Sequence, residues 1–390
     1  MKKIINKFKK KIYIYNTLKH KKEIFKPIKK NKIGMYVCGP TLYKKIHLGN
    51  CRTFIMFDIF FRYFKHLKYK IKYIRNITDI NNNYIKNKKK INLFNYIKLN
   101  KKNYIFFKKN NKKLNLLSPN LEPKTTCHII EQIDNINKIL KKKKAYNIKG
   151  SIYFNINKFN KKNKKYGFLI NKIDIKKLKY NKSTYKKKNF YDFALWKKKN
   201  KIKWYSPWSY GLPGWHIGCT TMSTKYLGKY FDIHGGGLDL KFPHHECEIA
   251  QNNVINNNNM AKYWIHVNML NINNKKMSKS LNNFIYLDKF KKINPLIIKL
   301  YFLQTHYRKI INFSFKSLKK TSKIYYYLIN YFNRIKKIKL YKKSNINIKK
   351  LYYNCYYAIN DDFNIPLLIF NLIKINKIID LCIIKKKKNK

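Results

Sequence analysis

Residues 33–53 read Ile-Gly-Met-Tyr-Val-Cys-Gly-Pro-Thr-Leu-Tyr-Lys-Lys-Ile-His-Leu-Gly-Asn-Cys-Arg-Thr, and they set the framework for the rest of the chain. The first five residues are a short apolar run that predicts a buried strand, and Gly39-Pro40 ends it in a turn. Apolar spacing from Ile46 to Phe61 predicts an amphipathic helix, which we expect Thr41 to cap. A strand, a turn and a helix N-terminus make a phosphate site, because free backbone N–H groups point outward there.

The start of that predicted helix carries a short motif, His47-Leu48-Gly49-Asn50. It resembles the His-Ile-Gly-His signature of class I aminoacyl-tRNA synthetases, in the variant that ends in Asn. A four-residue match also fits a helix-start histidine beside a packing glycine. Other parts of the chain therefore have to support the assignment.

The charge of the chain is extreme, at +74 over 390 residues. This length is enough for two or three units with a core. The excess is lysine, and it comes with many Asn, Ile, Tyr and Phe, all of which have codons made only of A and T. We therefore attribute much of the charge to a biased genome. The charge attracts polyanions at low salt but does not establish specific binding.

Glycine is rare in this composition, with only 12 residues, so its positions are informative. Ten of the glycines fall in three groups, which are Gly34, Gly39 and Gly49; Gly211, Gly214, Gly218 and Gly228; and Gly235, Gly236 and Gly237. Such clustering indicates backbone requirements, such as a positive φ or the close approach of a ligand.

The seven cysteines are scattered and odd in number, which does not suit a disulfide framework and favours a reducing compartment. No apolar run reaches the length that spans a membrane. Residues 1–11 are basic but lack the apolar core of a signal peptide. We therefore expect a cytoplasmic protein that does not enter membranes.

Several elements follow from the pattern further along the chain. Strands are expected at 11–15, 69–76, 151–156, 166–170, 190–196, 230–234 and 264–270. A helix is expected at 125–140, and the chain should be mostly helical beyond Leu296. Asp79 follows a strand, so it either faces a ligand or caps the next helix. The asparagine tract 252–259 suggests a loosely ordered loop.

Four separated residues make up a donor set that suits zinc. His244 and Glu248 share one face of a helix, Cys38 ends a strand, and Cys219 ends a glycine-rich turn. Three neighbours compete as ligands, namely His245, Glu246 and Cys247. Spacing alone does not choose between a zinc site and side chains that simply pack or cap, since the zinc-finger and zincin signatures are absent.

Two further motifs have ordinary alternatives. The run from His234 to Gly237 is similar to the oxyanion motif of esterases, but the chain lacks the G-x-S-x-G elbow that such enzymes require. Residues 276–280, Lys-Met-Ser-Lys-Ser, would be a solvated loop if taken alone. Their place after the His47 motif matches the class I arrangement, in which two lysines neutralise charge on the β- and γ-phosphates.

The motifs together resemble those of the cysteinyl-tRNA synthetase family over about residues 12–370. In order, they are Cys38 after residues 35–37, Gly214-Trp215-His216-Ile217-x-Cys219, Phe231-Asp232-Ile233-His234 before three glycines, Phe242-Pro243-His244-His245-Glu246, and Lys276 to Ser280. The resemblance implies one zinc ion per subunit, held by Cys38, Cys219, His244 and Glu248. It also implies that zinc binds the thiolate of the substrate cysteine.

The resemblance assigns further roles. The implied catalytic residues are His47, Asn50, Lys276 and Lys279. ATP, with Mg²⁺, would contact Gly39, Thr41, His47, Gly49, Asn50, Gly235, Gly236, Gly237, Lys276, Ser278 and Lys279. The amino acid and adenylate would contact Thr41, Trp215 and His234. The implied substrates are L-cysteine, ATP and tRNA(Cys), and we expect a monomer.

We predict an α/β protein with the Rossmann-like nucleotide-binding fold of class I synthetases, an inserted domain and a C-terminal α-helical bundle. The predicted units are 1–110, the first half of the catalytic domain; 111–205, the inserted connective domain; 206–270, the second catalytic half; 271–315, the Lys-Met-Ser-Lys-Ser loop and stem-contact region; and 316–390, a tRNA-binding bundle.

Three departures from the family pattern stand out. Gly218 replaces a larger side chain, Asn81-Asn82-Asn83 replaces an acidic run, and the chain looks C-terminally shortened, without the small anticodon domain. The shortening keeps two alternatives open. One is a cysteine ligase that acts on an aminosugar without tRNA, and the other is a non-catalytic relative that binds zinc and RNA. Methionyl-tRNA synthetase shares the scaffold, but the pocket's Cys/Cys/His/Glu set favours cysteine.

Overall fold

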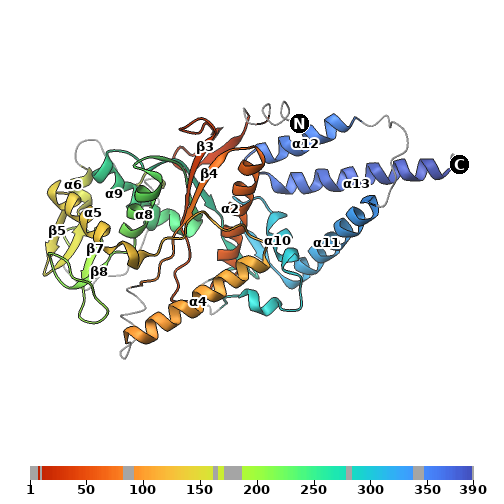
Figure 1. Cartoon of the computed structure of the whole chain (residues 1–390). Coiled ribbons are helices and arrows are strands. Elements are labelled where there is room, and N and C mark those ends of the chain that lie inside the picture. Colours follow the sequence, from red (N-terminus) through yellow and green to blue (C-terminus); the bar gives the residue numbers. More distant parts are fainter. Residues whose placement is uncertain are drawn as a thin grey trace.

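A computed structural model describes residues 8, 11–81, 92–160, 166–170, 187–277, 283–336 and 347–388. At its centre lies a four-stranded parallel sheet with strand order β10-β9-β3-β4 (Figure 1). Its strands are β3 (Lys32–Val37), β4 (Lys70–Arg75), β9 (Phe231–Gly237) and β10 (Ala261–Val267). β3 pairs with β4 on one side and with β9 on the other, so that Tyr36 lies opposite His234. This mixed α/β architecture is the predicted one.

Helix α2 (Leu48–His66) follows β3 and covers the sheet with its aromatic side. Phe57, Phe60 and Phe64 are fully buried there, which is the usual reason that an amphipathic helix is stable in a folded protein. The residue that caps the helix is His47, so the prediction that Thr41 caps it was wrong. Thr41 instead forms a bridge with Thr78, because the turn after β3 continues as extended backbone.

An antiparallel sheet with strand order β5-β6-β7-β8 interrupts the parallel one in sequence (Figure 1). Its strands are β5 (Ala145–Ile148), β6 (Ser151–Phe154), β7 (Phe193–Lys198) and β8 (Gly211–Pro213), and the helices around it are η1 (Thr125–His128), α5 (Ile129–Lys141) and α6 (Ile156–Asn160). The prediction of a strand at 166–170 was wrong. Backbone N–H groups there bind the carboxylate of Glu246 instead of a neighbouring strand.

The chain returns to the central sheet through helix α8 (Ile217–Leu227), and β9 is followed by the short turns η2 (Leu238–Leu240) and η3 (Lys241–His245) and by helix α9 (Glu246–Asn256). The expectation of a loose loop at 252–259 was wrong for its first half. Asn252 and Asn253 are buried in α9, and their side chains hold Asn258 and Asn259 as the chain turns toward β10. The asparagine side chains thus fix the turn between α9 and β10 through hydrogen bonds.

A second small sheet, in the order β12-β11-β13, leads to the C-terminal helices. The remaining elements are β1 (Tyr13–Asn16), β2 (Lys21–Ile24), α4 (Leu93–Lys113), β11 (Leu270–Ile272), β12 (Lys275–Lys276), η4 (Leu287–Phe290), α10 (Pro295–Leu303), β13 (Ile311–Phe313), α11 (Phe315–Lys336), α12 (Ile348–Asn360) and α13 (Ile365–Lys388). Helices α11, α12 and α13 form the end of the molecule opposite the antiparallel sheet (Figure 1).

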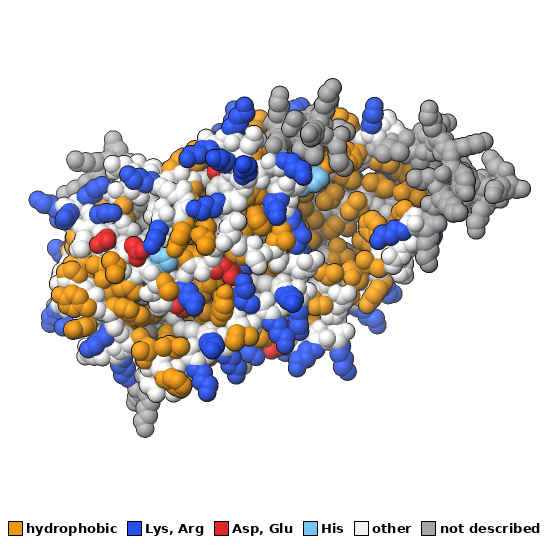
Figure 2. Space-filling model, in the orientation of Figure 1, with side chains coloured by type: hydrophobic (Ala, Val, Ile, Leu, Met, Phe, Trp, Pro, Cys, Tyr) orange, Lys and Arg blue, Asp and Glu red, His pale blue; other side chains and the backbone are white. Residues whose placement is uncertain are grey.

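The surface reflects the composition of the chain. Figure 2 shows Lys and Arg side chains scattered over all parts of the visible face, with far fewer Asp and Glu side chains. None of the helices in the described part of the chain combines the length and the apolar character that crossing a lipid bilayer requires.

Candidate metal centre and nucleotide cavity

Four side chains with metal-binding atoms meet at the end of β3. Cys38 Sγ lies 3.8 Å from Cys219 Sγ and 3.7 Å from Glu248 Oε1, and His244 Nε2 lies 2.9 Å from the same carboxylate oxygen. All four residues are buried. The first turn of α8 brings Cys219, the short turn η3 brings His244, and the first turn of α9 brings Glu248. The structure thus gathers the four residues that the sequence singled out as possible zinc ligands.

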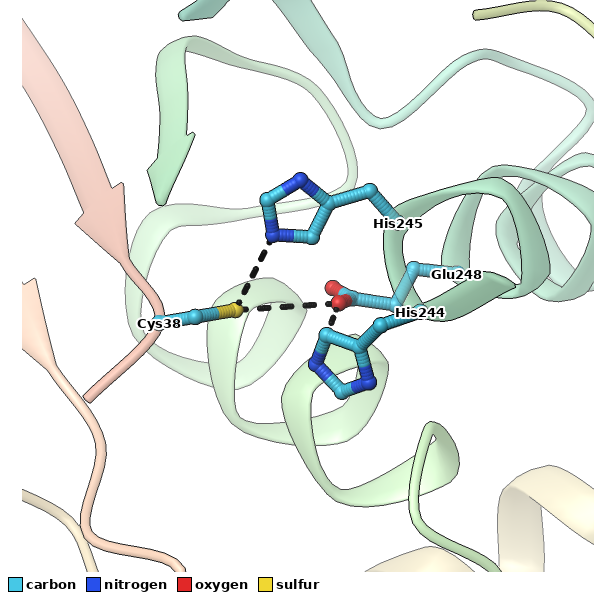
Figure 3. Close-up of side chains that lie close together, drawn as sticks. All are labelled: Cys38, His244, His245 and Glu248. Atoms are coloured by element: carbon cyan, nitrogen blue, oxygen red, sulfur yellow. Dashed lines mark hydrogen bonds and ion pairs between the residues drawn. The ribbon is translucent and has the colours of Figure 1, made fainter. Parts of the chain in front are cut away.

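His245 is a fifth candidate in the same place. Cys38, His244, His245 and Glu248 each offer a ligand atom, and these atoms lie within 4.8 Å of one another (Figure 3). His245 Nε2 lies 3.3 Å from Cys38 Sγ, while its Nδ1 lies 2.8 Å from His266 Nε2. His245 is therefore held from behind by a second imidazole.

The other two competitors face away from the cluster. The carboxylate of Glu246 accepts three backbone N–H groups from residues 167–169, at 2.7, 2.7 and 2.9 Å. Cys247 Sγ lies 3.3 Å from the hydroxyl of Tyr166. Their hydrogen bonds give both residues a role in holding residues 166–169 against α9.

Electrostatics concentrate negative charge in the cluster. Burial would raise the pKa of Glu248, but His234 and His244 outweigh it and lower that pKa to about 2. The hydrogen bond with Cys38 lowers the pKa of Cys219 to about 6, while burial holds the pKa of Cys38 well above its usual range. Burial would lower the pKa of His244, but Glu248 and Cys219 raise it to about 10. A thiolate and a carboxylate in a buried space are what a divalent cation stabilises.

A cavity of about 420 Å³ borders this cluster. Of the residues predicted to bind ATP, cysteine or metal, those that line it are Cys38, Gly39, Thr41, His47, Gly49, Asn50, Trp215 and Gly237. Cys38 belongs to the cluster, and His47 caps α2. The candidate metal centre and the helix N-terminus that suits phosphate therefore border the same cavity. Gly235, Gly236 and His234 are not among the lining residues.

His47 meets the cavity at the first turn of α2. Its backbone N–H donates to Asn50 Oδ1 at 3.1 Å, which fixes the turn. Burial, with a contribution from Lys44, lowers the pKa of His47 to about 4, so the imidazole is neutral near pH 7. Its Nδ1 is buried and has no hydrogen-bond partner among the described residues. A buried polar atom without a partner, on a residue that lines a cavity, suits a ligand that supplies one.

Two glycines explain how the walls of the cavity come together. A Cβ at Gly49 would lie 3.0 Å from Met277 Cε, so the absent side chain lets the helix start approach the segment after β12. A Cβ at Gly235 would lie 2.0 Å from Phe57 Cζ. Gly235 is thus required for packing α2 against the sheet.

The Lys-Met-Ser-Lys-Ser motif at residues 276–280 lies partly outside the described residues. Lys276 ends β12 and Met277 lines the cavity, whereas Ser278 and Lys279 lie outside the described residues. Of the departures noted above, Asn82 and Asn83 also lie outside them. Asp79 does not cap the next helix, α4, whose cap is Asn92; its carboxylate accepts instead from Thr126 N at 3.0 Å and from Thr126 Oγ1 at 2.5 Å, in the first turn of η1.

Sequence reasoning missed part of the cavity wall. The ring centroid of Phe284 lies 4.9 Å from that of His47, and Asn268 follows β10 into the same wall. Neither residue belongs to a motif with a recognisable spacing. Only the tertiary fold brings these segments to the helix start, so the sequence held no signal for them.

Comparisons with known proteins agree with this geometry. Residues 24–323 match the family described as tRNA synthetases class I (C) catalytic domain. A cysteine–tRNA ligase of Azobacteroides pseudotrichonymphae is 42% identical over 97% of this chain and 82% of its own length. One of Bacteroides thetaiotaomicron is 43% identical over 94% of this chain and 80% of its own length.

Solved structures share the fold at low sequence identity. A methionyl-tRNA synthetase of Mycobacterium tuberculosis, bound by methionyl-adenylate, has a TM-score of 0.66 at 9% identity, covering 90% of this chain and 84% of its own. An arginyl-tRNA synthetase of Campylobacter jejuni has a TM-score of 0.58 at 13% identity, covering 90% and 87%. The sequence matches are far closer, and they show that the chain belongs to the cysteine–tRNA ligases, within the class I aminoacyl-tRNA synthetases.

Proposed function

We propose that this protein activates L-cysteine with ATP and transfers it to the 3′ end of tRNA(Cys). The observation that carries the proposal is the convergence of Cys38, Cys219, His244 and Glu248 next to a cavity that both Cys38 and His47 line. Sequence similarity to cysteine–tRNA ligases over more than nine tenths of the chain supports it independently.

The same four residues would hold one zinc ion per chain. Their donor set fits zinc, because two thiols, an imidazole and a carboxylate suit its tetrahedral, nitrogen- and sulfur-rich preference. When bound, zinc would supply a soft site for a substrate thiolate that the hydroxyl of serine cannot replace. An apolar pocket alone separates such close analogues poorly.

Activation joins cysteine to AMP. A carboxylate oxygen of cysteine attacks the α-phosphorus of ATP, and the bond to the bridging oxygen of pyrophosphate breaks. Neutral His47, Asn50 and the start of α2 would donate hydrogen bonds to the crowded phosphates, since His47 Nδ1 has no described protein partner. Lys276, Ser278 and Lys279 would hold the departing pyrophosphate together with Mg²⁺.

The rest of the pocket would orient the two substrates. We assign Gly39, Thr41, Gly49 and Gly237 to the ATP side and Trp215 to the cysteine side, because each lines the cavity. Gly235 and Gly236 would act through the backbone shape of β9. His234 would support the cysteine side from behind, since its Nε2 lies 2.8 Å from Glu248 Oε2.

Transfer completes the reaction. A hydroxyl of the terminal adenosine of tRNA attacks the carbonyl carbon of the adenylate, AMP leaves, and an ester of cysteine forms. Helices α11 to α13 would contact the body of the tRNA, because lysines recur along them. We propose that the protein acts as a monomer in the cytoplasm.

The experiment compares acceptors and amino acids. Cysteine-dependent exchange of pyrophosphate into ATP measures activation, and acid-precipitable cysteine measures transfer to unfractionated tRNA. The proposal expects both activities, with serine inactive and with loss after zinc chelation. Coupling to an aminosugar without tRNA would support the alternative ligase, and no exchange at all would support the non-catalytic relative.

A further inference from the structure

Arg52 stands out in helix α2, where it lies between Asn50 and Thr53, two residues that line the cavity. It is buried, with 2% of its surface exposed. Within the described residues no acidic side chain forms an ion pair with it, and burial lowers its pKa to about 10. A buried guanidinium is costly unless its N–H groups are satisfied. Its partners therefore show what it does in the fold.

Those partners are backbone carbonyl groups from two separate segments. Nη1 donates to the oxygens of Asn268 and Met269 at 2.8 and 2.6 Å. Nη2 donates to those of His306, Tyr307 and Lys309 at 3.3, 3.5 and 2.5 Å. One side chain thus joins α2 to residues 268–269 and to residues 306–309.

The two segments lead directly into the sheet that carries Lys276. Residues 268–269 precede β11, and residues 306–309 precede β13. β11 pairs with both β13 and β12, and Asn271 lies opposite Lys276. Arg52 therefore holds the beginnings of the two strands that position β12.

The segment 306–309 is also fastened from its other side. The carboxylate of Asp362 accepts from the Tyr307 hydroxyl at 2.6 Å and from Arg308 Nε at 2.6 Å. Asp362 lies between α12 and α13. The C-terminal helices and the start of α2 are thus joined through one short stretch of backbone, with Arg52 on the side of the cavity.

We propose that Arg52 is a positioning residue, which sets the distance between the His47–Asn50 helix start and the β11–β12 hairpin that carries Lys276. This inference rests on the proposed function, because it assigns both motifs to ATP. Lysine cannot replace arginine here, since one ammonium has three donors at a single point while the guanidinium spreads five over a planar fork. A misplacement of about 1 Å in such a site costs about 100-fold in rate.

The test compares Arg52→Gln and Arg52→Lys with a matched control, Arg62→Gln, in the full-length protein. Arg62 lies in the same helix and also binds a buried carboxylate and a carbonyl, Asp58 at 2.8 Å and Asn115 O at 2.6 Å, but neither partner belongs to residues 268–269 or 306–309. We expect both Arg52 variants to lower kcat of cysteine-dependent pyrophosphate exchange about 100-fold. The KM for cysteine and the zinc content should stay within about twofold, because the cluster is built on other elements.

Hydrogen exchange supplies a readout besides activity. Amides of residues 270–277 should exchange faster in the Arg52 variants, while those of the central sheet stay protected, and Arg62→Gln should leave residues 270–277 unchanged. Arg52 variants that match Arg62→Gln in kcat, or that lose cysteine affinity and kcat together, would overturn the inference. If the wild-type protein itself shows no cysteine-dependent exchange, the proposed function fails instead.

Discussion

The sulfur of Cys38 lies 3.8 Å from the sulfur of Cys219, although 181 residues separate them in the sequence. The parallel sheet produces this meeting, because Cys38 follows β3, and α8, which carries Cys219, packs against β3 and its neighbour β4. The two thiols differ in pKa, because the hydrogen bond with Cys38 lowers the pKa of Cys219 to about 6. Cys219 is therefore a thiolate near pH 7, whereas the raised pKa of Cys38 means that this thiol gives up its proton only when a cation binds.

Removing either sulfur should remove the metal. Cys38→Ser and Cys219→Ser are expected to lower bound zinc from one per chain to less than about 0.2, because hydroxyl is a poor zinc ligand. Cysteine-dependent pyrophosphate exchange should fall with it. Zinc is measured by mass spectrometry of the purified protein, with the exposed Cys127→Ser as the control. Full zinc occupancy in either cluster variant would contradict the ligand assignment.

The two adjacent histidines should behave differently. His244→Gln is expected to lose zinc, since His244 Nε2 lies beside the Glu248 carboxylate. His245→Gln should keep it, because His245 is held between His266 and Cys38 and serves to orient that sulfur. Zinc content at equal protein concentration distinguishes them. The reverse pattern would make His245, rather than His244, the histidine ligand.

His47 should act as a neutral hydrogen-bond donor. His47→Ala is expected to lower kcat of pyrophosphate exchange by about 10²- to 10³-fold. Because its pKa is lowered to about 4, the imidazole of His47 stays uncharged above about pH 5. The pH–rate profiles of the wild type and of His47→Ala should therefore have the same shape near pH 6.5. His66→Ala, at the other end of the same helix, is the control. A wild-type step near pH 6.5 that disappears in His47→Ala would contradict this role.

Local patterns predicted the framework of the site well, and the reasons are physical. The apolar run before Cys38 has no stable place except a buried strand, and the glycine and proline after it prevent the strand from continuing. The regular apolar spacing of α2 likewise leaves one stable arrangement. The secondary structure of such segments is determined by residues that are close together in the sequence.

The sequence did not predict those features of the site that depend on contacts between segments far apart in the chain. Glu246 and Cys247 remained candidate ligands because spacing does not tell which way they face, and residues 166–170 decide it by binding both. Asn252 and Asn253 looked like loop residues because their partners lie beyond the helix end. Arg52 has no spacing signal at all, since its partners are backbone carbonyls far along the chain.

A buried ion pair should make stability depend on pH. Arg75 Nη2 lies 2.7 Å from Glu122 Oε1 and Lys108 Nζ 2.7 Å from Oε2. Burial would raise the pKa of Glu122, but the two cations outweigh it and lower that pKa. Its stabilisation is therefore complete above the unfolded pKa of about 4.3 and is lost as pH falls through the folded value.

Glu122→Gln tests that dependence. We expect a loss of about 1–3 kcal/mol at pH 7, seen as a lower melting temperature in scanning fluorimetry. The difference in stability between wild type and variant should narrow as the pH falls below the unfolded pKa of about 4.3, because proton uptake by Glu122 then favours the unfolded wild-type chain. An equal difference at pH 7 and pH 3.5 would mean that the pair carries no net electrostatic stabilisation.

Zinc K-edge X-ray absorption tests the central claim most directly, because it counts the sulfur atoms around the metal. In the zinc-loaded protein we predict two sulfur ligands at about 2.3 Å, from Cys38 and Cys219. Adding L-cysteine should raise the count to three, and adding L-serine should leave it at two. A count that stays at two while cysteine is being activated would contradict the claim that zinc selects the substrate through its sulfur.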